Sequence, residues 1–220
     1  MASEDCSILP DVELFESLFS KFNDYYFENE LVKPVITISP DRHRGRILGY
    51  CTCQKVWTEN KKYSQKEIEN MTMEEFEAYM DEGSYEINIV AEYMNRSLEG
   101  LAETLLHEMC HLLNLQRGVR DTSRYGSYHN ENFRKVADTH GLISSTVPNY
   151  GYAYTELTDE TKDFLKSLGN LDFKIYRKNF NKHTKRRQST RKYVCPICGT
   201  IIRATRSVNI GCLDCNVAML

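Results

Sequence analysis

The chain has 220 residues, of which 41% are hydrophobic and 27% charged. This composition is ordinary for a water-soluble globular protein, and no stretch approaches the ~18 consecutive apolar residues of a transmembrane helix. The N-terminal segment MASEDCSILPDVELF is acidic and lacks the basic and apolar regions of a signal peptide. We therefore expect a cytoplasmic protein with no membrane partner.

The formal net charge of −3 conceals an asymmetry along the chain. Residues 173–220 contain eleven Lys and Arg and a single acidic residue, Asp214, whereas residues 1–172 contain 17 basic and 30 acidic residues. An acidic body with a basic tail is typical of proteins whose tail contacts nucleic acid.

The N-terminal part of the chain predicts a helix followed by two strands. Asp11 is a typical N-cap residue, and apolar residues at helical spacing follow it through residues 12–30. Runs rich in β-branched and aromatic residues at 35–39 and 47–57 predict the strands.

The middle of the chain predicts a capped helix and a third strand. Thr72 and Glu75 form a capping box for a helix that ends at Gly83. Residues 85–91 alternate between apolar and polar side chains, which indicates a strand. We expect the three strands to form a small antiparallel sheet.

Three further helices are predicted after this strand. The first covers residues 101–115, the second is capped by Asn130 and ends at Gly141, and the third is capped by Thr158. Residues 144–157 have an irregular pattern and are expected to form a surface loop. Strands flanked by helices in this order predict an α+β fold.

The segment LAETLLHEMCHLLNL at 101–115 contains the pattern H-E-x-x-H. On a helix, His107 and His111 lie one turn apart on the same face, so both can reach one zinc ion, with Glu108 beside them to act on a zinc-bound water. Burial of this helix is indicated by leucines at helical spacing, and buried His and Glu are costly unless something satisfies them. These leucines are Leu101, Leu105, Leu112 and Leu115.

A catalytic zinc needs a third protein ligand and one open position. His129, just before the helix capped by Asn130, is the best candidate. Glu131 and His140 remain alternatives, although a histidine at the end of a helix is also explained by the helix dipole.

Two C-x-x-C pairs lie near the C-terminus, at CPIC and CLDC. Pairs with this spacing, each next to a glycine, predict a zinc ribbon in which four thiolates surround a structural zinc. The ligands are Cys195, Cys198, Cys212 and Cys215. We therefore expect two zinc ions per chain, one catalytic and one structural.

An acid-free basic run with interspersed aromatic residues precedes the ribbon. A solvated linker is the simplest interpretation of such a run, but cations that neutralise phosphates and aromatics that stack on bases favour sequence-nonspecific DNA binding. The candidate contacts are Lys174, Arg177, Lys178, Lys182, Lys185, Arg186, Arg187, Arg191, Lys192, Arg203 and Arg206.

Four motifs together make the chain resemble the SprT-like family of zinc metallopeptidases, whose member Spartan cuts proteins crosslinked to DNA. They are FNDYYFENELVKP at 22–34, LGYCTCQKVW at 48–57, TLLHEMCHLLN at 104–114 and HNENF at 129–133. The resemblance implies a zincin-like fold with a SprT-type zinc ribbon. It also implies His107, His111 and His129 as zinc ligands and Glu108 as catalytic base.

A peptidase of this kind also needs a hydrogen-bond donor for the oxyanion, and the sequence offers Arg124, Tyr125, Tyr128 and Tyr152 without choosing among them. We expect a peptidase domain at 1–169, a basic linker at 170–192 and a ribbon at 193–220. The expected function is zinc-dependent cleavage of DNA-bound or DNA-crosslinked proteins, at the nucleoid if the source is bacterial. The alternatives are a non-proteolytic nucleic-acid-binding adaptor and a peptidase of free proteins with no nucleic-acid role.

Overall fold

The computed structural model describes residues 7–41, 47–58, 63–178 and 190–220. The chain divides into two compact units, Met1–Lys178 and Asn179–Leu220. The mixture of helices and small sheets agrees with the predicted α+β class. Residues 170–178, which the sequence assigned to the linker, belong to the first unit.

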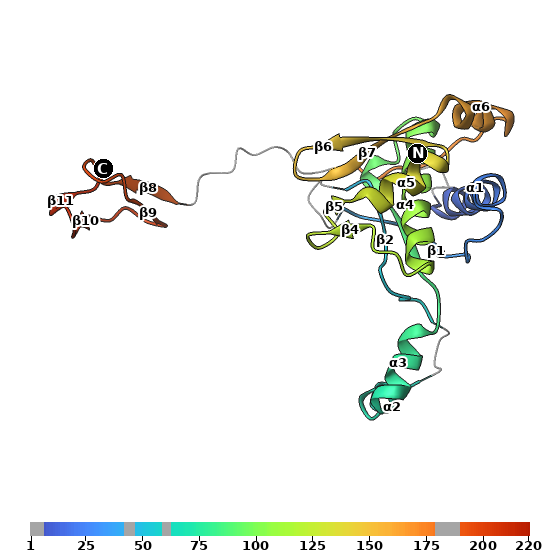
Figure 1. Ribbon diagram of the computed structural model, residues 1–220, viewed down its shortest axis with the longest axis horizontal. Coiled ribbons are helices and arrows are strands. Elements are labelled where there is room, and N and C mark those ends of the chain that lie inside the picture. The colour runs from blue at the N-terminus through green and yellow to red at the C-terminus, as the bar shows by residue number, and fades with distance from the viewer. Residues whose placement is uncertain (1–6, 42–46, 59–62, 179–189) are drawn as a thin grey trace, which may run out of the picture. The chain divides into compact units, whose positions relative to one another are not determined.

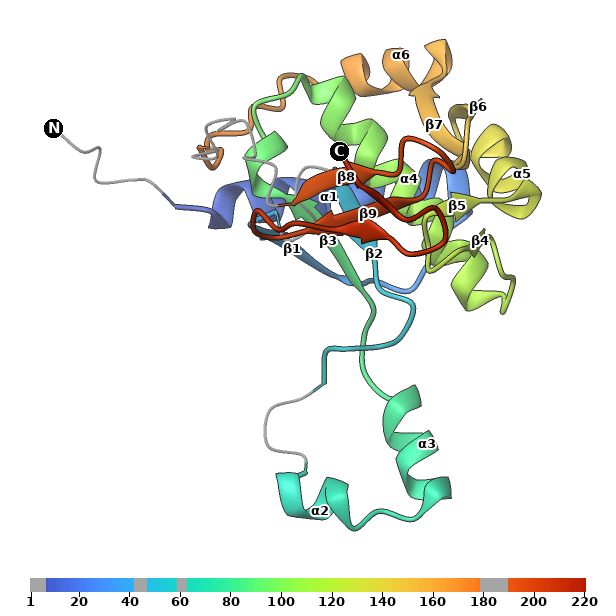
Figure 2. The same cartoon turned by 90° about the vertical axis from the view of Figure 1, so that its left-hand side faces the viewer.

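The first sheet of unit 1 has the strand order β1-β3-β2 (Figure 2). β1 (Val35–Ser39) runs parallel to β3 (Glu86–Val90), and β2 (Gly49–Cys51) runs antiparallel to β3. The sheet is therefore mixed, and the prediction of an antiparallel sheet is wrong for the β1–β3 pair. The central strand β3 has β2 as its antiparallel neighbour on one edge and β1 as its parallel neighbour on the other. The predicted strand at 47–57 shortens to β2 and one isolated bridge, Trp57 to Ser84.

The core of unit 1 lies between this sheet and two long helices. Helix α1 (Leu9–Phe27) and helix α4 (Leu98–Gln116) bury their apolar faces against each other, and α1 also packs on β1 and α4 on β3. The fully buried side chains include Phe15, Leu18, Phe22, Ile87, Leu105, Met109 and Leu112. Burial of this stripe fixes the rotation of α4 and thereby the direction in which its histidines point.

A second sheet, with strand order β4-β5-β7-β6, is formed by residues that follow α4 along the chain. Its strands are β4 (Thr122–Ser123), β5 (Tyr128–His129), β6 (Leu142–Val147) and β7 (Gly151–Leu157). The prediction of a loop at 144–157 is wrong, because β6 and β7 form an antiparallel hairpin. Alternate residues of β7 are buried at Thr155 and Leu157, a period that the turn residues around Pro148 obscured.

Two helices belong to the same part of the chain, α5 between β5 and β6 and α6 after β7. Helix α5 (Glu131–Thr139) begins after Asn130, whose side chain accepts the N–H of Asn132, as the capping pattern predicted. Helix α6 (Asp159–Ser167) begins after Thr158, which accepts the N–H of Thr161. A short 3-10 turn, η1 (Ala91–Tyr93), leads from β3 toward α4.

A helical hairpin is inserted between β2 and β3. It consists of α2 (Gln65–Glu69) and α3 (Met73–Asp81), and the capping box of Thr72 and Glu75 is present as predicted. The hairpin extends away from the two sheets in both ribbon views (Figures 1 and 2). Neither helix buries a single residue.

Asp11 has a different role from the predicted N-cap. Helix α1 already begins at Leu9, so Asp11 lies in its first turn. The carboxylate is buried and accepts the backbone N–H groups of Lys174 and Ile175 at 2.8 and 3.0 Å. Phe173 packs on Phe15 with 4.4 Å between ring centroids. Asp11 thus attaches the segment that follows α6 to helix α1.

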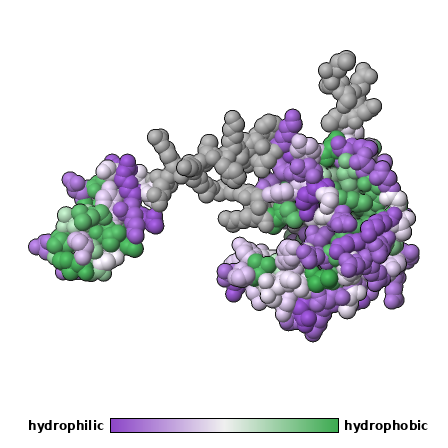
Figure 3. Space-filling model, turned by 90° about the horizontal axis from the view of Figure 1, so that it is seen from above, coloured by the Kyte–Doolittle hydropathy of each residue, from purple (hydrophilic) through white to green (hydrophobic). Residues whose placement is uncertain are grey.

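The second unit consists of two hairpins around a small core. β8 (Arg191–Val194) pairs with β9 (Ile201–Ala204), and β10 (Gly211–Cys212) pairs with β11 (Val217–Ala218). The buried residues are Cys195, Cys212 and Met219. In the space-filling view this unit shows an apolar area next to hydrophilic side chains (Figure 3).

Replacing Asp11 by Ala leaves two N–H groups without their acceptor. Hydrogen bonds to a charged group contribute roughly 1.5–3 kcal/mol each, so the free energy of unfolding should fall by at least about 2 kcal/mol. Urea denaturation monitored by circular dichroism measures the loss. Glu13→Gln, on the exposed side of the same helix, is the matched control and should change stability by less than about 0.5 kcal/mol. Equal stability of both variants would contradict this role for Asp11.

Candidate metal centre and active site

Three imidazoles meet between α4 and β5. His107 and His111 lie one turn apart on α4, and His129 is the last residue of β5. Their ring nitrogens form one of the two groups in the described part of the chain that could hold a metal ion. The structure therefore brings together the three histidines that the sequence and the family resemblance selected.

The spacing of these nitrogens suits a zinc ion. Nε2 of His129 lies 3.2 Å from Nε2 of His107 and 3.1 Å from Nε2 of His111. Two ligands held at ~2.0–2.1 Å from one zinc in tetrahedral geometry are about 3.3–3.4 Å apart. The three nitrogens thus point at one centre, as zinc ligands do.

His111 is held by a buried carboxylate. Its Nδ1 lies 2.7 Å from Oδ2 of Asp121, which also accepts the side-chain amide of Asn114 at 3.1 Å. Burial by itself lowers the pKa of His111, but the hydrogen bond to Asp121 and the charges of Glu108 and Asp121 raise it above its ordinary value. With Nδ1–H donating to Asp121, the lone pair of Nε2 faces the metal centre.

His107 is held through a hydroxyl group. Its Nδ1 lies 3.0 Å from Oγ1 of Thr155 on β7, and this hydroxyl donates to the carboxylate of Glu103. Since the Thr155 proton is used on Glu103, its oxygen accepts the Nδ1–H of His107, which leaves Nε2 free to bind a metal. Burial, and then the charges of His111 and His129, lower the pKa of His107 well below its usual value.

The sequence did not indicate Asp121, Thr155 or Glu103 as functional. Glu103 lies one turn before His107 on α4, so an i, i+4 carboxylate was a readable signal. Thr155 comes from the hairpin that was predicted to be a loop. Burial raises the pKa of Glu103, while its hydrogen bond from Thr155 and the charge of Arg96 oppose this shift.

His129 is placed by backbone pairing rather than by side-chain hydrogen bonds. Its backbone N–H donates to the carbonyl of Tyr150, and its ring lies 4.7 Å from the ring of Phe133 on α5. Nδ1 of His129 is buried and has no hydrogen-bond partner within the described ranges. Burial and the neighbouring His111 lower the pKa of His129 to about 4, so the ring is neutral and able to bind a cation.

Glu108 lies on α4 beside this centre and is 6% exposed. Burial raises its pKa to about 7, against the opposing effect of His111. Close packing around β2 requires a glycine at Gly49, because a Cβ there would lie 2.8 Å from the carbonyl oxygen of Asn88 and 3.0 Å from Cγ2 of Thr104. Oε1 of Glu108 lies at ordinary contact distance, 3.5 Å, from the same position. Strand β2 therefore borders the Glu108 carboxylate closely.

The two alternative third ligands are used elsewhere. Glu131 accepts hydrogen bonds from Arg134 and Tyr152. The ring of His140 stacks on Phe27 at 4.6 Å, and its Nδ1 donates to the carbonyl of Val136. Both side chains thus have structural partners outside the histidine group.

The four candidate oxyanion donors lie at other positions than the histidine group. Tyr125 is fully exposed at a turn with positive φ. Tyr128 neighbours His129 on β5, so its side chain points to the opposite face, where the guanidinium of Arg124 lies 5.1 Å from its ring. The hydroxyl of Tyr152 donates to Glu131. Of the four, none contacts the histidine group in this structure.

The second metal-binding group consists of Cys195, Cys198, Cys212 and Cys215, whose sulfur atoms lie within 4.8 Å of one another. Sγ of Cys198 and Sγ of Cys212 are 3.7 Å apart, and two thiolates at ~2.3 Å from a tetrahedral zinc are about 3.8 Å apart. Hydrogen bonds with Thr200 lower the pKa of Cys198 to about 6, which favours the thiolate. A metal ion held by all four cysteines would have no open position.

The candidate DNA-contacting residues divide into four sets. Lys174 and Arg177 belong to unit 1 and pair with Asp172 and Glu92. On unit 2, Lys192 of β8 lies directly opposite Arg203 of β9, and both are exposed. Exposed positions are also held by Lys178, Arg191 and Arg206. Outside the described residues are Lys182, Lys185, Arg186 and Arg187.

The fold and the histidine group define a candidate metalloprotein of α+β class. A model of the SprT-like family matches residues 15–150, which is more than half of the chain, so this chain belongs to the SprT-like family. The match confirms the resemblance seen in the sequence, and membership is consistent with a zinc metallopeptidase. No curated protein and no solved structure matches the chain.

Replacing Thr155 by Val removes the hydroxyl but keeps the side-chain shape, so His107 loses the acceptor that orients it. Changes of this kind cost about 10–100-fold in metal affinity. Zinc affinity, measured by competition with a chromophoric chelator, should fall for Thr155→Val and be preserved for Thr155→Ser. The four-cysteine group is an internal control, because its affinity should stay the same. Unchanged binding at both groups would show that Thr155 has no role at the metal.

Proposed function

We propose that this chain is a zinc-dependent endopeptidase with a zincin-like catalytic unit. The observation that supports this best is the convergence of three histidine Nε2 atoms, two of them from α4 and one from β5, beside the buried Glu108 of α4. A purely structural zinc needs no such glutamate, and a three-histidine set keeps a fourth position open for catalysis. Membership of the SprT-like family supports the same class of enzyme.

Each side chain has a defined task in this proposal. Zinc, when bound, lowers the pKa of a water molecule toward ~7 and polarises the scissile carbonyl. Glu108 accepts the proton of the attacking water and passes it to the leaving amine. Asp121 and the Glu103–Thr155 pair keep the Nδ1 protons of His111 and His107 in place, so that both Nε2 lone pairs stay directed at the site.

We assign the four-cysteine group to a structural zinc that stabilises unit 2. The buried part of this unit is small and consists largely of the cysteines themselves. A unit of this size rarely folds on its apolar core alone, and zinc binding supplies the missing free energy. The unit then corresponds to a zinc ribbon.

The substrates we propose are proteins bound or crosslinked to DNA, with unit 2 as the DNA-binding part. Lys192 and Arg203 place two cations side by side on the β8–β9 hairpin, where like charges repel unless anions such as phosphates lie between them. Tethering to DNA raises the local concentration of DNA-bound substrates. The proposed location is accordingly the cytoplasm, at the nucleoid if the source is bacterial.

Replacing Glu108 by Gln keeps the shape of the side chain and removes its ability to accept a proton. Cleavage of casein and histone should fall by at least about 10²-fold, the typical contribution of a general base. Metal analysis should still find zinc at the wild-type content. Glu99→Gln, at an exposed position of the same helix, should cleave at the wild-type rate. Cleavage by the Glu108 variant at the wild-type rate would sink the peptidase proposal.

Replacing Lys192 and Arg203 by Gln should weaken binding of single-stranded DNA of any sequence. Each lost phosphate contact reduces the slope of log affinity against log salt by about 0.7–1. Fluorescence anisotropy with a labelled oligonucleotide measures both quantities, and Lys21→Gln with Lys135→Gln is the matched control pair. If affinity and slope stay unchanged, the hairpin has no contact with DNA. If DNA also fails to stimulate histone cleavage, the chain is better described as a peptidase of free proteins.

A further inference from the structure

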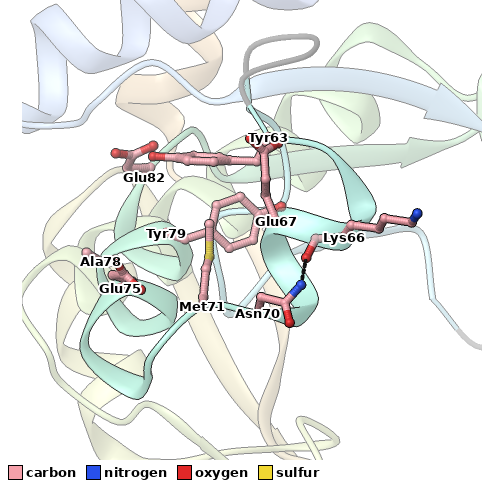
Figure 4. Close-up of a pocket in the computed structure, with 9 residues that line it drawn as sticks. All are labelled: Tyr63, Lys66, Glu67, Asn70, Met71, Glu75, Ala78, Tyr79 and Glu82. Atoms are coloured by element: carbon pink, nitrogen blue, oxygen red, sulfur yellow. Dashed lines mark hydrogen bonds between the residues drawn. The ribbon is translucent and has the colours of Figure 1, made fainter.

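The helical hairpin between β2 and β3 carries a groove that the catalytic site does not use. The groove lies between α2 and α3 and has a volume of about 530 Å³. Its apolar lining consists of Tyr63, Met71, Ala78 and Tyr79. Figure 4 shows the two tyrosine rings and the Met71 side chain gathered between the helices.

The lining has the chemistry of a receptor for cationic side chains. The rings of Tyr63 and Tyr79 are 5.6 Å apart in a T-shaped arrangement, and the ring of Phe76 lies 6.2 Å from that of Tyr79. Aromatic faces attract Lys and Arg, whose aliphatic stems also pack on apolar surface. Carboxylates surround these rings, at Glu67, Glu75 and Glu82 (Figure 4).

Two carboxylates of the groove are stabilised in their charged form by capping hydrogen bonds. Hydrogen bonds from Ser64 and Thr72 lower the pKa of Glu67 and Glu75. Residues 63–84 contain seven acidic residues and one basic residue, Lys66. The hairpin is therefore a strongly negative part of the molecule, and a partner that binds it must be positively charged.

The hairpin also exposes apolar side chains that its own fold does not cover. Met73 is 73% exposed and Phe76 39% exposed, on the same face of α3. Two short helices with no buried residue gain little stability from each other, since helices of this length are marginal in water. An apolar surface rimmed by charge is typical of a protein interaction site.

We propose that this groove docks a Lys- and Arg-rich segment of the protein substrate. The hairpin joins β2 to β3, and β2 borders Glu108, so a substrate engaged at the hairpin is held by the element that leads directly to the candidate active site. The inference rests on the proposed peptidase function and adds to it a preference for basic substrate segments. The bound side chains place their stems on Tyr63 and Tyr79 and their charges at the glutamates.

Binding is tested first in the full-length Glu108→Gln protein, where no cleavage interferes. Glu67→Gln, Glu75→Gln and Glu82→Gln are combined, because glutamine preserves both capping boxes. The control combines Glu13→Gln, Glu28→Gln and Glu160→Gln, which remove the same charge from exposed positions of α1, its C-terminal end and α6. The probe is a fluorescent decalysine peptide, measured by anisotropy.

The groove variant should bind decalysine about tenfold more weakly, equivalent to about 1.4 kcal/mol in total, because three weak surface charge pairs are lost. The control should change by less than about twofold. Tyr79→Leu, with all charges kept, should also weaken binding, which separates the aromatic contribution from the net charge. Equal loss in the groove and control variants would overturn the proposal, because it would reduce the effect to overall charge.

A cleavage assay in the background with an intact Glu108 links docking to catalysis. In the groove variant the KM for histone should rise, while cleavage of the acidic protein casein should stay as in the wild type. Unchanged histone KM would overturn the docking role even if decalysine binds. Failure of the peptidase proposal looks different, because the wild-type protein would then cleave neither substrate while decalysine binding persists.

Discussion

The orientation of two of the three imidazoles at the candidate metal centre depends on hydrogen bonds to their Nδ1 atoms. An imidazole that binds a metal through Nε2 keeps its proton on Nδ1, and an acceptor for that proton fixes the orientation of the ring. Asp121 supplies that acceptor to His111 directly, and Thr155 supplies it to His107 with Glu103 behind it. The acceptors come from three different segments, so the metal centre requires the whole of unit 1 to be folded.

This requirement explains several features of the fold. Helix α4 must be buried against α1 and β3 so that its histidines face the second sheet. Strand β7 must pair with β6 so that Thr155 faces inward. Gly49 must lack a side chain so that β2 can approach the carbonyl of Asn88 on β3 and Thr104 on α4. Burial of Glu108 follows from the same packing, and it raises the pKa of this carboxyl to about 7, a value suited to a general base.

Local signals were sufficient for much of this arrangement. The capping residues Thr72, Asn130 and Thr158 start helices where the sequence predicted them, because a cap acts within three residues of itself. Six of the seven candidate metal ligands were recognisable because helical spacing and short C-x-x-C loops are local as well, whereas His129 on β5 was selected by its place before a helix and by the family resemblance. Asp11 misled the same reasoning, since its partners lie more than 160 residues away at Lys174 and Ile175. Thr155 escaped notice for the same reason, since its partners His107 and Glu103 lie 48 and 52 residues away. The parallel β1–β3 pair also depends on a long-range contact.

DNA binding by unit 2 and docking of basic segments at the hairpin, the two proposals made above, together account for the separation of acidic and basic residues along the chain. Proteins that bind DNA do so with Lys and Arg, and those side chains are neutralised by phosphates while the complex is intact. An acidic groove on the hairpin competes with DNA for the same cations, so it can engage only basic segments that are not in contact with phosphate. In the proposed function, the cations of unit 2 would act in the opposite sense by holding the chain on the DNA itself. A chain with both features would remain close to its substrates while selecting their accessible basic segments.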